Sequence, residues 1–170
     1  KKDPYGVLAI FEYKNPSITK LIIRGKYYFI PDCYLTLGNA VSAYLKQEHL
    51  EKFFKNYVLC PIPLSTARLR WRGFNQSEII ARVVSHKLNL QMEPVLVRTR
   101  WTKTQKNLKQ AARQKNISGC FAVTSQNAVI NKSILLIDDV VTTGATLREA
   151  ALTLKLAGAK DVWCLAVARD

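Results

Sequence analysis

The sequence contains no apolar run close to the roughly 18 residues that a membrane-spanning helix needs. Its first residues also lack the apolar stretch of a secretory signal peptide, so we expect a soluble cytoplasmic protein without a membrane span. Histidine occurs twice and cysteine four times, and no two cysteines form a C-x-x-C pair. This scarcity argues against zinc sites and disulfides and favours buried free thiols.

Methionine is also scarce, because the chain has one, at Met92. Lys1 is therefore not an initiator residue, and we expect an amino-terminal segment to precede the given residues. Whatever that segment carries is not visible in this sequence.

Acidic residues are few: 12 Asp and Glu stand against 26 Lys and Arg, for a formal net charge of +14. No acid at all occurs between Glu93 and Asp138, whereas that stretch holds Arg98, Arg100, Lys103, Lys106, Lys109, Arg113 and Lys115. Such an excess favours polyanionic partners, namely phosphorylated metabolites, nucleic acid or an anionic membrane surface. Charge alone does not choose among them.

The length of 170 residues and the hydrophobic content of 48% suit one globular α/β domain. Residues 134–137 form an aliphatic run, which is typical of a strand buried on both faces of a parallel sheet. A helix follows, with Thr146 and Glu149 spaced as a capping box and Gly158 as its stop, and residues 161–168 form another strand. This order predicts a right-handed crossover, with the ligand crevice at the carboxyl ends of the strands.

Upstream, the sequence predicts a helix that begins near Asn75, where Glu78 repeats the capping-box spacing, and another that begins at Pro31 and Asp32. We expect strands at residues 7–13, 26–30, 57–63, 95–97 and 120–123. Residues 1–56 are expected to form a small N-terminal cap and hood-like region beside a core of residues 57–170.

The stretch "DDVVTTGAT", residues 138–146, places two acids and a short loop directly before a helix. Free backbone N–H groups and the dipole at a helix start favour an anion of phosphate size, and Gly144 lets the backbone approach its oxygens closely. The two carboxylates would repel phosphate, so they must hold another group. Vicinal ribose hydroxyls are suitable donors, and Mg²⁺ with its waters would offset the remaining charge. Because side chains of successive extended residues point oppositely, we do not expect both acids to chelate one ion together.

Four hydrophobic residues, two acids and then TTGAT resemble the ribose-5-phosphate signature of type I phosphoribosyltransferases. The stretches "CPIPL", "RLRWRGFNQSEIIA", "TRWTKTQKNLKQAARQKNISGCF" and "VWCLAVAR" together resemble the ComF/GntX family of competence-associated, phosphoribosyltransferase-like proteins. The resemblance covers about Tyr57 to Asp170. Members commonly begin with a cysteine-rich zinc-binding segment, which this chain does not show.

The resemblance implies a type I phosphoribosyltransferase-like parallel sheet flanked by helices. It also implies that the ligand is phosphoribosyl pyrophosphate, with Mg²⁺ bound at Asp138 and Asp139, directly or through water, and with these acids on the ribose as the candidate catalytic residues. The implied 5-phosphate loop consists of Val141, Thr142, Thr143, Gly144, Ala145 and Thr146. The implied pyrophosphate residues are Pro63, Leu64, Arg68, Arg72, Arg100, Lys103 and Arg113, the last three on a loop that closes over pyrophosphate.

Simpler readings exist for each motif. The acid–threonine loop is also compatible with an ordinary strand-to-helix connection, although its residue order is too particular for that to be favoured. The basic stretch is also compatible with a solvated surface, and Trp71 and Trp101 with packing rather than with stacking on a base.

Two functions remain open. The first is a Mg²⁺-dependent transferase in which a nitrogen nucleophile displaces pyrophosphate. The second is an accessory module of DNA uptake that binds single-stranded DNA, senses a ligand in the same pocket, and works with an uptake helicase or channel.

Overall fold

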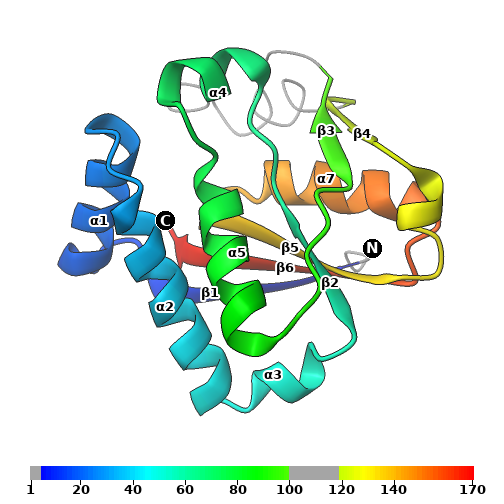
Figure 1. Ribbon diagram of the computed structural model, residues 1–170, viewed down its shortest axis with the longest axis horizontal. Helices are drawn as coiled ribbons and strands as arrows, with labels where there is room; N and C mark the ends of the chain where they lie inside the picture. Colours follow the sequence, from blue (N-terminus) through cyan, green and yellow to red (C-terminus); the bar gives the residue numbers. More distant parts are fainter. Residues whose placement is uncertain (1–4, 100–118) are drawn as a thin grey trace.

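The computed structural model describes residues 5–99 and 119–170. At its centre is a four-stranded sheet of order β1-β6-β5-β2, in which each neighbouring pair is parallel (Figure 1). Its strands are β1 (Gly6–Glu12), β2 (Tyr57–Pro61), β5 (Ser133–Val141) and β6 (Asp161–Arg169). The predicted α/β class with a parallel sheet is therefore confirmed.

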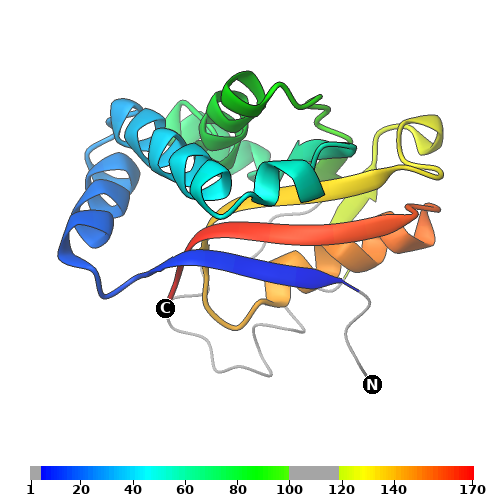
Figure 2. The same cartoon turned by 90° about the horizontal axis from the view of Figure 1, so that it is seen from below.

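Helices cover both faces of this sheet (Figure 2). One face carries α1 (Pro16–Tyr27), α2 (Asp32–Gln47) and α5 (Gln76–Leu88), and the other carries α7 (Ala145–Leu156). The shorter helices are α3 (Leu50–Phe53), α4 (Thr66–Arg72) and the 3-10 turn η2 (Gln126–Ala128). Within the described residues, no helix is long and apolar enough to cross a membrane.

The aliphatic run of β5 joins the two cores of the molecule. Ile134 and Leu136 pack in the core on the α7 side, whereas Leu135 and Ile137 pack in the core under α2 and α5. All four side chains are fully buried, and each such burial contributes about 1.5–3 kcal/mol. The run is thus buried on both faces of the sheet, as the sequence predicted.

In the amino-terminal third, β1 is an edge strand of the central sheet, paired in parallel with β6. The strand predicted at residues 26–30 is wrong, since Lys26 and Tyr27 are the last residues of α1. Helix α1 begins after Asn15, whose side chain caps two backbone N–H groups, and Pro16 suits its first turn. Its buried residues, Ile18, Ile22 and Gly25, lie at helical spacing.

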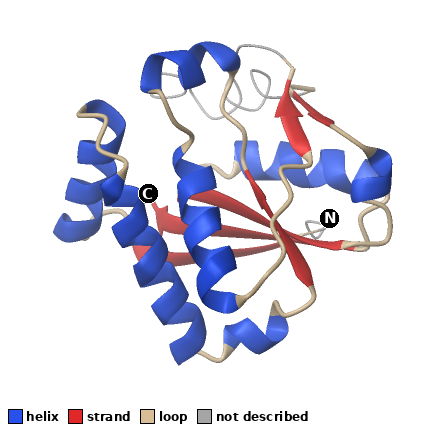
Figure 3. Ribbon diagram, in the orientation of Figure 1, coloured by secondary structure: helices blue, strands red, loops and turns tan. Residues whose placement is uncertain are grey.

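Strands β3 (Leu96–Arg98) and β4 (Phe121–Val123) form an antiparallel pair separate from the central sheet (Figure 3). Most of the basic stretch, with Arg100, Lys103 and Arg113, falls in residues 100–118 and lies outside the described residues. The four cysteines are buried free thiols, which confirms the expectation from their spacing.

Candidate functional site

The two adjacent carboxylates lie near the carboxyl end of β5, where the sheet opens on one side. β2 pairs with β5 only as far as Pro61 opposite Ile137, whereas β6 continues beside Asp138. The Ile62 N–H then donates to the Ile137 carbonyl at 2.9 Å, and the chain continues into the loop before α4. Both carboxylates are buried yet line a cavity beside that loop.

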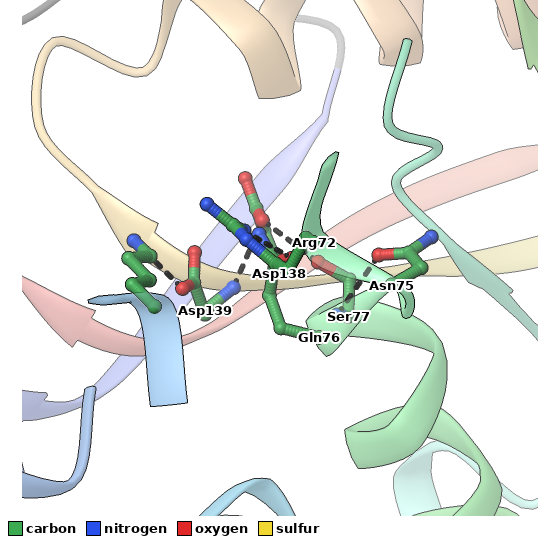
Figure 4. Close-up of polar contacts among 7 residues, drawn as sticks. Arg72, Asn75, Gln76, Ser77, Asp138 and Asp139 are labelled. Carbon is green, nitrogen blue, oxygen red and sulfur yellow. Dashed lines mark hydrogen bonds and ion pairs between the residues drawn. The ribbon is translucent and has the colours of Figure 1, made fainter. Parts of the chain in front are cut away.

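A chain of hydrogen bonds ties Asp138 to the start of α5 (Figure 4). Its Oδ1 accepts from the Ser77 hydroxyl at 3.0 Å and from the Asp139 backbone N–H at 2.9 Å. The Ser77 N–H donates to the side chain of Asn75, the predicted N-cap, at 3.1 Å. The Asn75 amide in turn donates to the Ile62 carbonyl at 3.0 Å. The loop after β2, the start of α5 and the end of β5 are therefore held as one unit.

Asp139 is held from the opposite direction by the amino-terminal third. The Lys26 Nζ lies 2.7 Å from the Asp139 Oδ2, and the two side chains are 23% and 5% exposed. An ion pair this little exposed is partly desolvated, so removal of one partner would leave the other charge buried without compensation. Although the two acids are neighbours in one strand, they have different partners and reach one cavity.

The loop after β5 forms a shallow niche of about 30 Å³ at the start of α7. Gly144 is the N-cap residue with a φ of 73°, a conformation that favours glycine. The predicted capping box is wrong, because Thr146 lies inside the helix and the Glu149 carboxylate accepts from the Gly119 N–H instead. The residues that line the niche are Asp138, Val140, Val141, Thr142, Gly144, Ala145, Thr146 and Leu147, so Thr143 is the one residue of the implied phosphate loop that does not.

Next to the niche lies a larger cavity of about 480 Å³, which shares Asp138, Val140 and Thr146 with it. Its charged lining residues are Lys26, Arg68, Arg72, Arg98, Asp138 and Asp139. Of the residues implied for pyrophosphate, Pro63, Leu64, Arg68 and Arg72 therefore come together here. The Arg72 guanidinium donates to the Gln76 side chain at 2.6 Å and stays close to the α5 start (Figure 4).

Two pKa shifts describe the electrostatics of this cavity. Burial, together with the neighbouring Asp139 charge, raises the pKa of Asp138 to about 7, although the Asp139 backbone N–H, Lys26 and the Ser77 hydrogen bond oppose the rise. Burial, with the nearby charges of Arg98 and Arg72, lowers the pKa of Arg68. Arg98 and Arg72 thus repel Arg68 at the cavity wall, and a bound anion would relieve that repulsion.

The donors at the site suit one kind of metal ion. Within the part of the chain that the structure describes, no three His, Cys, Asp or Glu side chains gather into a metal cage. Mg²⁺ in phosphate-transferring sites is commonly held by one or two carboxylates, with substrate phosphates and waters as the other ligands. Asp138 and Asp139 therefore fit a Mg²⁺ ion that shares its coordination with a phosphorylated ligand, but they do not fit an ion held by protein alone.

Three residues of this site were missed from the sequence. Lys26 was assigned to a strand at 26–30, although the helical spacing of the apolar residues before it could have indicated the end of a helix. Ser77 carried no signal beyond its place in the first turn of α5. Arg98 was seen only as part of the basic stretch, because nothing local shows that β3 brings it to the cavity.

Comparisons with known proteins agree with this architecture. Residues 72–170 match the family model of the phosphoribosyl transferase domain. Competence protein F of Haemophilus influenzae is 32% identical over 112 residues, which are 64% of this chain and 49% of that protein. DNA utilization protein YhgH of Escherichia coli K12 is 38% identical over 107 residues, 61% of this chain and 46% of that protein. The matched part is therefore less than half of each of these relatives.

Two further proteins match this chain, one by its sequence and one by its structure. Competence protein ComFC of Bacillus subtilis is 38% identical over 100 residues, 59% of this chain and 39% of that protein. Among solved structures, the allosteric regulatory enzyme of purine biosynthesis superposes with a TM-score of 0.55 at 18% identity, over 85% of this chain and 29% of that chain. At that identity the likeness shows a shared fold alone.

Proposed function

Because the chain belongs to the phosphoribosyl transferase domain family, within its ComF group, we propose that it binds phosphoribosyl pyrophosphate with Mg²⁺. One observation carries the proposal: the buried Asp138 borders both a niche at a helix start and a cavity that Asp139 and three arginines also line. That order of acceptor and donor groups matches the order of groups along the ligand, which is phosphate, ribose hydroxyls and pyrophosphate.

Each part of the site has a role in this proposal. The backbone N–H groups at the start of α7 donate hydrogen bonds to the 5-phosphate, and Gly144 has no Cβ that would clash with it. Asp138 and Asp139 accept hydrogen bonds from the vicinal hydroxyls of the ribose. Arg68 and Arg72 pair with the pyrophosphate, because guanidinium groups suit planar, bidentate recognition of its oxygens.

The same geometry supports transfer of the phosphoribosyl group to a nitrogen nucleophile. As the bond from C1 to pyrophosphate breaks, positive charge develops on the ribose and negative charge on the leaving group. The carboxylates lie on the side of the positive charge and the arginines on the side of the negative charge. When bound, Mg²⁺ supplies further charge neutralisation at the pyrophosphate oxygens. No residue of the cavity is required as a general base.

Calorimetric titration with phosphoribosyl pyrophosphate, with and without Mg²⁺, tests the binding step. We expect saturable binding that Mg²⁺ strengthens and that Asp139→Asn abolishes. Absence of heat for the folded wild-type protein in both conditions would refute the proposal. Release of pyrophosphate on addition of candidate bases and amines then tests transfer, and a protein that binds the ligand but releases none would restrict the function to ligand sensing.

We further propose a role in DNA uptake during natural competence, with single-stranded DNA and an uptake helicase or channel as partners. The net charge of +14 favours this role, as does Trp71, which is 60% exposed beside the basic residues of α4. Affinity for a single strand should fall steeply between about 0.05 M and about 0.2 M salt. Equal affinity at both concentrations would exclude direct contact, whereas Asp139→Asn should leave this binding unchanged.

A further inference from the structure

Lys26 brings a charge from the amino-terminal third into the site of the core. It lies in the last turn of α1, outside residues 72–170 that match the family domain. Its Nζ lies 2.7 Å from the Asp139 Oδ2, and the residue lines the same cavity as Arg68 and Arg72. The burial of α1 rests on other residues of the helix, so packing alone does not account for this placement.

Gly25 explains how α1 comes close enough. A Cβ at Gly25 would lie 2.4 Å from the Tyr34 Cε2, so only glycine permits this contact between α1 and α2. Tyr34 is fully buried and packs edge to face against Phe74, next to the α5 cap, with ring centroids 5.9 Å apart. The end of α1 is therefore packed against the elements that hold the carboxylates, and Lys26 is positioned rather than free to swing in solvent.

An ammonium group has three N–H donors, and among the described residues Lys26 forms an ion pair with the Asp139 carboxylate. The side chain is 23% exposed, and it borders the cavity. An anion in this cavity would meet the buried carboxylate pair, which must be neutralised before negative charge is bound beside it. An ammonium group between the carboxylate and the anion neutralises the carboxylate and attracts the anion.

We propose that Lys26 is a further ligand-binding residue of this cavity, whose ammonium keeps its ion pair with Asp139 and donates to the pyrophosphate of the bound ligand. The inference rests on the proposed function. It implies that the ligand site is assembled from the amino-terminal third and the core together, and that residues 72–170 alone lack Lys26 as well as Arg68.

Lys26→Met tests the contact by titration with two ligands, phosphoribosyl pyrophosphate and ribose 5-phosphate. Loss of one charge-assisted hydrogen bond should weaken phosphoribosyl pyrophosphate about 10-fold or more. Ribose 5-phosphate lacks the pyrophosphate, so its affinity should fall by clearly less. Lys20→Met is the matched control, because Lys20 is exposed on the same helix, lines a different hollow and should leave both affinities unchanged.

A second measurement needs no variant. Saturating pyrophosphate should slow reductive methylation of Lys26 in the wild-type protein and leave that of Lys20 unchanged, as read by peptide mass spectrometry. If wild-type protein binds neither ligand, the proposed function fails and this inference falls with it. If the wild-type protein binds, three results overturn this inference alone. Lys26→Met binds phosphoribosyl pyrophosphate as tightly as the wild type, or it loses affinity for both ligands to the same degree, or pyrophosphate does not protect Lys26 from methylation.

Discussion

Asp138 should make the protein less stable as the pH rises, and Asp138→Asn should remove that loss. In the folded protein burial and the Asp139 charge raise the Asp138 pKa from 3.8 to about 7. Between these values the folded state holds a proton that the unfolded state has released. The stability that this proton contributes is therefore complete below the unfolded pKa and is lost as the pH rises through the folded pKa.

The size of the effect follows from the shift. At about 1.36 kcal/mol per pH unit, the full shift corresponds to about 4 kcal/mol, of which at most about 3 kcal/mol falls between about pH 5 and about pH 8. The asparagine variant keeps an Oδ1 that accepts from the Ser77 hydroxyl and the Asp139 N–H, so the hydrogen bonds survive without the charge.

Urea unfolding of the wild type and of Asp138→Asn at a series of pH values measures this difference. We expect the variant to be more stable at about pH 8, by about 1–3 kcal/mol, and the advantage to shrink toward zero at about pH 5. Taking the difference between the two proteins cancels the groups that titrate in both.

Asp32→Asn is the control, because Asp32 is an exposed carboxylate in the first turn of α2. This variant keeps Asp138, so it should lose stability with rising pH as the wild type does. The reasoning is refuted if Asp138→Asn shows a difference that is independent of pH, or if it is less stable than the wild type at about pH 8.

The remaining predictions concern binding and packing. Arg72→Gln should weaken the binding of phosphoribosyl pyrophosphate about 10-fold, as measured by calorimetry, because it removes a cation from the cavity. Arg70→Gln, on the exposed side of α4, should leave the affinity unchanged. Equal losses in the two variants would point to net charge instead. Gly25→Ala should lower the free energy of unfolding by about 1–2 kcal/mol in urea, since the clash with Tyr34 outweighs the gain of about 1 kcal/mol in helix propensity; an unchanged or higher midpoint would contradict this.

Local patterns predicted the elements that depend on neighbours in sequence. The aliphatic run of β5 and the Asn75 cap of α5 came out as expected, because burial periodicity and capping act over a few residues. Local signals failed where a distant partner decides. Glu149 has capping-box spacing, yet it bonds the Gly119 N–H, 30 residues away in the sequence. The stretch at 26–30 is rich in β-forming residues, but its start completes a helix that buries Ile18 and Ile22.

By itself, the sequence determined the class of the fold and the place of the acid pair, because a buried strand followed by a helix start puts that pair at the end of a parallel sheet. It also determined the excess of positive charge. Only the tertiary structure decided which groups meet the carboxylates. Ser77 reaches Asp138 from α5 and Lys26 reaches Asp139 from α1, across separations of 61 and 113 residues. Contacts between residues so far apart in the sequence depend on how the helices pack on the sheet. No periodic pattern in the sequence identifies the residues that this packing brings together.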